Sequence, residues 1–150
     1  MTVDRAHALN GIHARLEDAE LLWTSGRRES GLLICLVAFA ALSRLTTPRL
    51  SDREAFEVLM KTTHSWTIRV EYRGSLHDID HILYKWLRCE LIHTAALPVD
   101  LAIDDTLAPA DVLAIRAGGP PQHRLLISPA WFTHVHAFTH QAIQPPHQVQ

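Results

Sequence analysis

The stretch LLICLVAFAAL, Leu32 to Leu42, is apolar at every one of its eleven positions. A helix that is apolar all round has to be covered by other helices or by a partner chain. Arginine residues lie close to both ends of the stretch, and a membrane span needs about 20 apolar residues. We therefore expect a buried central helix from about Glu29 to Leu45, and no membrane partner.

Amphipathic segments flank this central helix. Val3–Trp23 repeats apolar residues at three- and four-residue steps, which predicts a helix that stops near Gly26. Ser51 or Asp52 can cap a third helix. Its expected inner face consists of Phe56, Leu59 and Met60.

The next part of the chain contains a fourth helix. Trp66–Gly74, WTIRVEYRG, alternates apolar and polar residues and is typical of a short strand or an extended connection. We expect Ser75 to cap a helix over Leu76–Ala95, which Pro98 prevents from continuing. Its expected packing residues are Ile79, Ile82, Leu83, Trp86 and Leu87.

The pattern changes after Pro98. The runs LPVDLAI, DVLAIRAG and HRLLIS are short, apolar and separated by Asp, Pro and Gly, which predicts a small β-meander or hairpin. Ser128-Pro129 then opens a last helix. The predicted fold is mainly α: an antiparallel helical bundle at residues 3–95 and a β addition with a last helix at 98–143. With 150 residues the chain is long enough for one domain, 1–150, with its own core.

Composition limits the classes of function. The formal net charge is −2, so a broad basic surface for non-specific nucleic-acid binding is not expected. The two cysteines, Cys35 and Cys89, suggest neither a disulfide framework nor a metal motif. The first ten residues lack an apolar signal region. These features predict a cytoplasmic protein.

The fourth helix carries the residues of chemical interest, in LYKWLRCELIHT, Leu83 to Thr94. Arg88 and His93 are about 140° apart on an ideal helix, so one helix cannot direct both at one atom without the long reach of the arginine. Two copies around a two-fold axis could bring two Arg and two His into one cleft. A histidine can move a proton near neutral pH, and the planar guanidinium of an arginine can hold a phosphate oxygen. These are the groups that RNA cleavage through the 2′-hydroxyl requires.

The spacing alone is weak support. With twelve Arg and eleven His in 150 residues, chance gives about one Arg followed five positions later by a His, and the chain has one. The alternative is that Arg88 is a solvated charge and that His93 interacts with the dipole at the helix C-terminus.

The chain as a whole resembles the HEPN family, the higher eukaryotes and prokaryotes nucleotide-binding domains. The resemblance covers roughly residues 3–95. It rests on RCELIH, Arg88 to His93, which has the family's Arg, four intervening residues and His on a late helix, and on a helical pair at residues 16–42 that resembles the family's N-terminal hairpin. The part after Pro98 looks like a subfamily addition.

This resemblance implies a metal-independent endoribonuclease that acts as a homodimer on RNA, with no cofactor. Arg88 and His93 of both copies would be catalytic, His93 as acid/base or hydrogen-bond donor and Arg88 on the phosphate. Many members are toxins of toxin–antitoxin, phage-defence or stress systems, so an antitoxin is an expected partner. Lys85 and Tyr84 are candidate auxiliary residues, because a cation beside an aromatic ring suits an unpaired base.

Cys89 departs from the family pattern, which often has Asn, Asp or His after the motif arginine. A thiol is a weak hydrogen-bond donor and would orient Arg88 or a phosphate less firmly. The alternative function is therefore a catalytically inactive HEPN-like module that binds a nucleotide, RNA or a partner protein. As a nucleophile, Cys89 lacks an evident orienting group and oxyanion donor.

Two histidine pairs have the spacing of metal ligands on a helix: His77/His81 and His136/His140. Each pair needs a third and a fourth ligand, and neither has an evident one in the sequence. We therefore expect exposed, neutral histidines and no metal. The four tryptophans, Trp23, Trp66, Trp86 and Trp131, are interpreted as core or interface residues.

Overall fold

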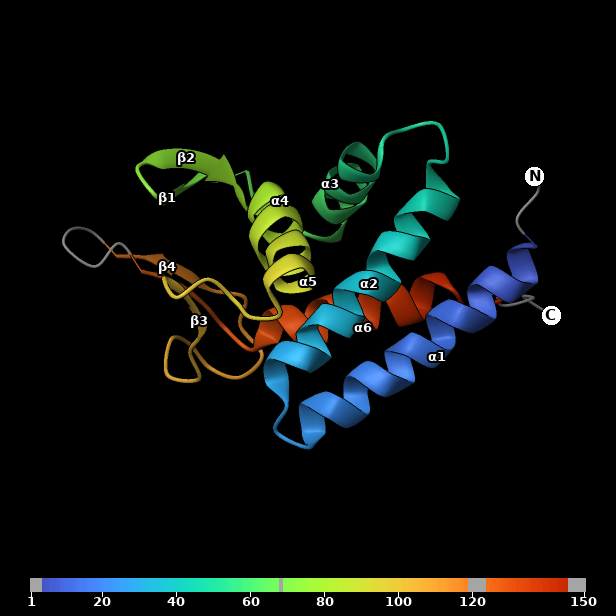
Figure 1. Ribbon diagram of the computed structural model, residues 1–150, viewed down its shortest axis with the longest axis horizontal. Helices are drawn as coiled ribbons and strands as arrows, with labels where there is room; N and C mark the ends of the chain where they lie inside the picture. Colours follow the sequence, from blue (N-terminus) through green and yellow to red (C-terminus); the bar gives the residue numbers. More distant parts are fainter. Residues whose placement is uncertain (1–3, 68, 119–123, 146–150) are drawn as a thin grey trace.

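The computed structural model describes residues 4–67, 69–118 and 124–145. Helix α2 (Arg28–Thr46) forms an antiparallel hairpin with α1 (Arg5–Thr24) and also packs against α3 (Asp52–Thr63) and α6 (Ala130–Ala142) (Figure 1). Its buried residues include Leu32, Cys35, Leu36 and Phe39. The prediction of a central helix covered by other helices is confirmed.

The α1–α2 hairpin is closely packed at Gly31. A Cβ atom at this position would lie 3.0 Å from the carbonyl oxygen of Ala19 and from the backbone nitrogen of Trp23. The absence of a side chain therefore lets the two backbones approach. Gly26, with φ +85°, lies just beyond the end of α1, as predicted from its position.

Helix α2 has the length and composition of a membrane span over its 19 residues. Half of its most apolar stretch is buried inside the molecule, a property that the core helix of a soluble protein shares.

Helix α3 begins with the predicted cap. The Ser51 hydroxyl accepts a hydrogen bond from the Glu54 backbone N–H, and the Glu54 carboxylate accepts one from the Ser51 N–H. This reciprocal pair is a capping box. Phe56 and Met60 are fully buried, whereas Leu59 is half-buried.

The predicted start of the fourth helix was wrong. Ser75–Asp78 forms strand β2, which pairs antiparallel with β1 (Arg69–Tyr72), so the helix begins at Ile79 and Ser75 is no cap. Arg73 and Gly74, with φ +53° and +81°, form the two-residue turn between the strands. Positive φ at both central positions is typical of a type I′ hairpin turn, which the Arg-Gly pair provides.

The fourth helix is continuous but not uniform. It consists of α4 (Ile79–Ile82), the π-helical segment η1 (Leu83–Cys89) and α5 (Glu90–Thr94). Ala95, with φ +62°, ends it in the left-handed conformation. The N-cap position belongs to Asp78.

A buried pair joins the end of α3 to the start of α4. His64 Nε2 and Asp80 Oδ1 are 2.6 Å apart, and the two side chains are 2% and 3% exposed. His64 Nδ1 accepts a hydrogen bond from the Trp66 backbone N–H, so Nε2 carries the proton and donates to Asp80. Burial raises the pKa of Asp80, while the hydrogen bond from His64 opposes that effect.

The strands after Pro98 form a sheet that contains one antiparallel pair of consecutive strands, as a hairpin does, but the sheet is not a meander. The order is β3 (Leu101–Ile103), β5 (Leu125–Ile127), β4 (Ile115–Ala117), with β3 and β5 parallel and β4 and β5 antiparallel. Strand β5 lies in the centre because its residues Leu125 and Ile127 are buried, and because Ser128 fixes its end beside β4. The Ser128 hydroxyl donates to the Val112 carbonyl and accepts from the Ala114 N–H.

Helix α6 belongs to the main core, although it lies in the part predicted as an addition. Trp131 is fully buried and its indole N–H donates to the Ala114 carbonyl oxygen at 3.2 Å. Phe132 stacks on Trp23 of α1, with ring centroids 4.1 Å apart. Trp86 is buried, and Trp23 and Trp66 pack against the core, so the interpretation of the tryptophans as core residues is confirmed.

Parts of the predictions lie outside the described residues: Val3, Ile68, His123 and positions 146–150.

Asp100 connects the β1–β2 hairpin to the segment before β3. Its carboxylate accepts a hydrogen bond from the Tyr72 hydroxyl at 2.7 Å and two from the Arg73 guanidinium at 2.8 and 2.9 Å. The Arg73 hydrogen bonds in particular lower the pKa of Asp100 to about 2.

We predict that Asp100→Asn lowers the free energy of unfolding at pH 7 by about 1 to 2 kcal/mol. The pKa of this carboxyl is about 2 in the folded protein and 3.8 in its ordinary state. A lowered carboxyl pKa stabilises the fold above the ordinary value, and this contribution disappears as the pH falls from about 4 to about 2. Urea denaturation of wild type and variant at pH 7 and at about pH 2 measures the difference in the free energy of unfolding.

Asp18→Asn, which removes an exposed ion pair with Arg15, is the control and should change the free energy of unfolding by less than about 0.5 kcal/mol. An Asp100→Asn effect of equal size at both pH values would contradict the prediction.

Candidate functional site

Four of the five predicted site residues lie in η1: Tyr84, Lys85, Arg88 and Cys89. The segment is π-helical, and the Glu90 backbone N–H donates to the Lys85 carbonyl oxygen five residues earlier. Such segments are rare and are often found at functional sites. The predicted site therefore coincides with the irregular part of the helix.

The sequence contains a signal for this irregularity. Ile79, Leu83, Leu87 and Leu91 repeat every four residues, and all four are at most 4% exposed. A four-residue repeat drifts around a regular α-helix by about 40° per step, because a turn has 3.6 residues. A turn closed by i→i+5 hydrogen bonds is wider, which keeps this row facing the core.

Arg88 is half-buried and incompletely paired. Its Nη1 lies 3.7 Å from the Cys89 sulfur, and its guanidinium carbon lies 5.5 Å from the centre of the Tyr84 ring. In the described part of the chain, the buried Arg88 Nε has no hydrogen-bond partner. A buried donor without a partner costs about 1 to 3 kcal/mol, more for a charged group. An anionic oxygen would satisfy it.

Tyr84 and Lys85 are turned toward other aromatic rings. The Tyr84 ring packs on Phe56 with centroids 5.4 Å apart, and burial, together with the neighbouring Cys89, raises the pKa of its phenol. Lys85 is exposed, with its Nζ 4.8 Å from the centre of the Trp86 ring. Tyr84 therefore packs beneath the Arg88 guanidinium, while Lys85 remains available on the surface.

His93 is exposed in the last turn of α5. No hydrogen bond joins it to Arg88 in the ranges that the structure describes. The structure thus brings Arg88, Cys89 and Tyr84 together, and among the described residues no hydrogen bond joins His93 to these three side chains. Ile92, its neighbour in the sequence, is 48% exposed.

The histidines of the two pairs were predicted to be exposed. His77, His81 and His136 are instead half-buried, and only His140 is exposed. The rings of His77 and His81 are stacked with centroids 5.6 Å apart. His136 Nε2 donates to the Leu16 carbonyl oxygen at 3.0 Å, while His140 is exposed. His134, a further histidine of α6, is hydrogen-bonded to the Thr63 hydroxyl at 3.0 Å. Within residues 4–67, 69–118 and 124–145, no group of three or more His, Cys, Asp or Glu is arranged to hold a metal ion.

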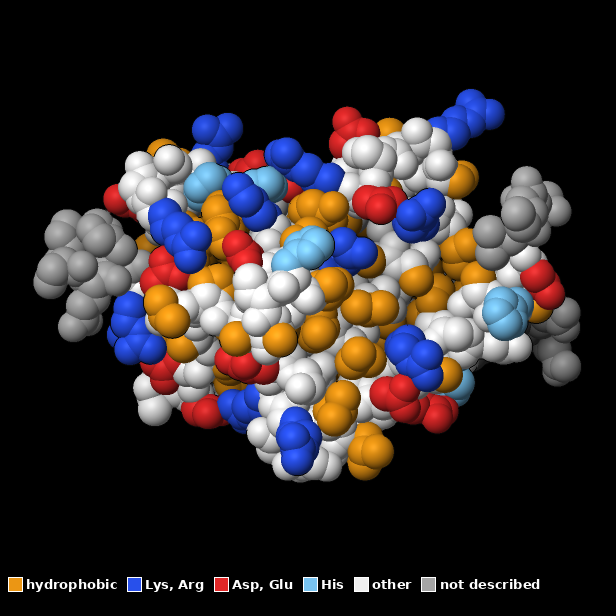
Figure 2. Space-filling model, in the orientation of Figure 1, with side chains coloured by type: hydrophobic (Ala, Val, Ile, Leu, Met, Phe, Trp, Pro, Cys, Tyr) orange, Lys and Arg blue, Asp and Glu red, His pale blue; other side chains and the backbone are white. Residues whose placement is uncertain are grey.

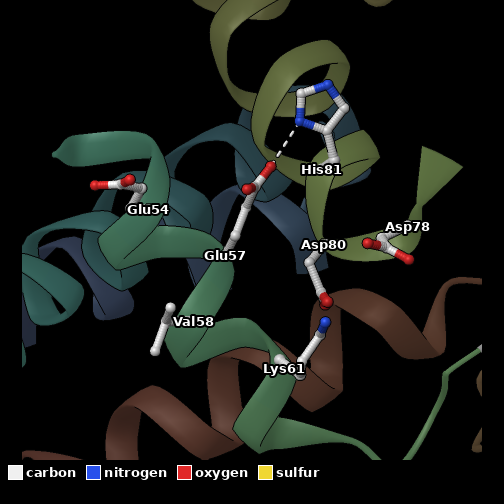
Figure 3. Close-up of a pocket in the computed structure, with 7 residues that line it drawn as sticks. All are labelled: Glu54, Glu57, Val58, Lys61, Asp78, Asp80 and His81. Atoms are coloured by element: carbon white, nitrogen blue, oxygen red, sulfur yellow. Dashed lines mark hydrogen bonds and ion pairs between the residues drawn. The ribbon is translucent and has the colours of Figure 1, made fainter. Parts of the chain in front are cut away.

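One group was missed by the sequence analysis. Glu57 of α3 bonds His81 Nδ1 at 2.6 Å, and the two residues line a shallow pocket between α3 and the start of α4 (Figure 3). Glu57 lies 24 residues before His81, and no local pattern links them. Only the packing of α3 against α4 reveals the pair.

Comparisons with known proteins do not identify the chain: no family model, curated protein or solved structure matches it.

We predict that Arg88→Met leaves the free energy of unfolding unchanged or raises it, by up to about 2 kcal/mol. The substitution removes a buried cation that lacks an ion pair among the described residues, and keeps most of the side-chain volume. Arg73→Met, which removes the hydrogen bonds to Asp100, is the matched comparison and should destabilise the fold. Urea denaturation of both variants measures the effects. Equal destabilisation by the two substitutions would show that Arg88 is a structural residue.

Proposed function

We propose that the protein is a metal-independent endoribonuclease of the HEPN type that acts as a homodimer. The observation that carries the proposal is the unpaired Nε of Arg88 on a π-helical segment, one residue from the segment's end. An arginine with a buried donor that lacks an acceptor is preorganised for an anionic ligand, and an RNA phosphate is a ligand of suitable shape and charge.

The chemistry requires one proton transfer to a base and one from an acid. The RNA 2′-oxygen attacks the adjacent phosphorus and loses its proton to a base, while the departing 5′-oxygen receives a proton. The products are a 2′,3′-cyclic phosphate and a 5′-hydroxyl. His93 exchanges the proton, and Arg88 stabilises the charge that develops on the phosphate oxygens.

A dimer accounts for the separation of His93 from Arg88. The groove beside His93 has a volume of about 370 Å³ and lies between the start of α2 and the end of α5. Its lining is mostly apolar: Leu33, Leu91, Ile92 and Ala95, with Glu29 and Ser30. Figure 2 shows hydrophobic side chains on the surface over α2 and α5. A second copy seated on this face would bring the two motifs close to one another.

A catalytically silent module that binds a nucleotide, RNA or a protein is the second candidate. It is favoured by Cys89, which stands where many active family members have Asn, Asp or His and which contacts Arg88 through sulfur at 3.7 Å. Under this function the same arginine binds an anion without cleavage.

We expect purified wild-type protein to cut total RNA or tRNA in excess EDTA and to leave 2′,3′-cyclic phosphate ends. Arg88→Ala and His93→Ala should reduce the rate by at least about 100-fold, the scale of one acid–base or electrostatic contribution. Sequencing gels with end-group analysis measure both the cuts and the ends.

His140→Ala is the matched control for that experiment. His140, like His93, is exposed in the last turn of a helix, but it lies on α6. Its removal should leave cutting unchanged. Absence of cutting by wild type, with RNA binding retained, would reject the ribonuclease and favour the silent module.

We further predict that Cys89→Asn increases the cleavage rate several-fold. The side-chain amide of Asn is a stronger hydrogen-bonding group than a thiol and would hold Arg88 or the phosphate more firmly. Single-turnover rates of Cys89→Asn and Cys89→Ala separate the amide effect from simple loss of sulfur. Equal or lower rates for Cys89→Asn would contradict the role assigned to this position.

A further inference from the structure

A second group of polar side chains gathers where the β1–β2 hairpin meets α3 and α4, away from Arg88 and His93. Figure 2 shows Lys, Arg and His side chains concentrated over the hairpin and α4. A surface pocket of about 320 Å³ lies here. Its lining residues are Arg53, Glu57, Arg69, Leu76, His77, Asp78 and His81. This volume is at the lower end of the range for small-molecule sites, roughly 300 to 1,000 Å³.

His81 is held in one orientation by its partner Glu57. Its Nδ1 lies 2.6 Å from the Glu57 carboxylate, which can only accept, so Nδ1 carries the proton. The other ring nitrogen points away from Glu57 (Figure 3). Both side chains are about one-fifth to one-quarter exposed, at 19% and 24%. The Nε2 atom therefore remains for a ligand at the pocket wall: it donates to a phosphate oxygen when the ring is protonated, and it accepts from a phosphate hydroxyl when the ring is neutral.

His77 forms the neighbouring wall. Its ring stacks on the His81 ring with centroids 5.6 Å apart. It also forms a T-shaped contact with the Trp86 ring, with centroids 4.9 Å apart. Burial, followed by the positive charges of His81 and Lys85, lowers the pKa of His77. The His77 ring therefore adds little positive charge beside His81.

Two arginines border the pocket with only weak partners of their own. The Arg53 Nε lies 3.4 Å from Glu57, and the Arg69 Nε lies 3.8 Å from Asp78. Their side chains are 59% and 68% exposed. Exposed ion pairs of this kind contribute little, so both guanidinium groups are available for a ligand.

We propose that this pocket, formed by His77 and His81 with Arg53 and Arg69, binds a phosphate group. The two guanidinium groups hold phosphate oxygens, the His81 imidazole supplies a hydrogen bond through Nε2, and His77 forms the pocket wall beside it. Glu57 acts as a positioning residue, since it reaches the ligand only through His81. The group bound is either the phosphate of a free nucleotide or a phosphate of RNA. The seven steps from His81 to Arg88 span about 10 Å of helix axis at the α-helical rise, a distance that one RNA strand can bridge.

A metal ion is a poorer occupant. Glu57 is engaged by His81, and the part of the chain that is described contains no set of three ligands at this site. The two arginine side chains are also more exposed than the two carboxylates of the pocket, at 59% and 68% against 24% for Glu57 and 47% for Asp78. A ligand that enters from solvent therefore meets the guanidinium groups first, which favours an anion.

The test is a titration of ¹⁵N-labelled full-length protein with three probes: inorganic phosphate, AMP and a short RNA oligonucleotide. The His77 and His81 ring signals, assigned with His77→Gln and His81→Gln, should move and saturate. The double variant Arg53→Gln/Arg69→Gln should bind at least about tenfold more weakly, as expected for lost charge-assisted hydrogen bonds. Arg15→Gln on α1, which removes a similar half-exposed ion pair, should bind as wild type does.

The probe that saturates at the lowest concentration identifies the source of the phosphate, and saturation by any of the three supports the pocket. Ring signals that do not move with any probe would overturn the proposal. Shifts that are equally strong in the double arginine variant would overturn it as well. RNA cleavage by the Arg88 and His93 variants is measured separately, so either proposal can fail while the other stands.

Discussion

The whole structure depends on covering α2. Its Leu32, Leu36 and Phe39 are at most 1% exposed, and burial of each such side chain contributes about 1.5 to 3 kcal/mol. One neighbouring helix covers only one side of an apolar cylinder. Helices α1, α3 and α6 therefore all pack on α2, and α6 has to return from the far end of the chain to do so. Gly31 allows α1 to come close enough to complete the cover.

The need to bury apolar side chains also explains the shape of the fourth helix. A row of apolar residues at four-residue intervals has to face the core, and the wider turn of η1 keeps it there. The solvent side then carries the polar and charged groups: Lys85 and half-buried Arg88 on η1, and His93 on α5. At Arg88 the packing of the helix buries the Nε atom without giving it a hydrogen-bond partner among the described residues, so the two requirements conflict there. Conflicts of this type are expected where a protein binds a ligand.

Both proposed sites suit the same chemical class. Arg88 Nε lacks an acceptor within the described residues, and the pocket where the β1–β2 hairpin meets α3 and α4 offers two arginines whose ion pairs are long and exposed. The net charge of −2 means that such cationic positions are local features of the surface. An anion would be drawn to one helix and its neighbours, in contrast to the broad basic surface of a non-specific nucleic-acid binder.

Helix boundaries and the choice of core residues follow from local pattern, and the sequence by itself determined them well for α1, α2, α3 and α6. The Ser51 capping box and the position of Gly26 are likewise interactions between near neighbours. Tertiary structure decided the features that join distant residues: the β1–β2 pairing that displaced the predicted helix start, the central place of β5, and the Glu57–His81 and His64–Asp80 pairs. These features could not be predicted because a hydrogen bond between residues 16 or 24 positions apart produces no local or periodic pattern in the sequence. Arg88 and His93 could be named from the sequence, but whether their side chains meet depends on packing that the spacing of two residues does not contain.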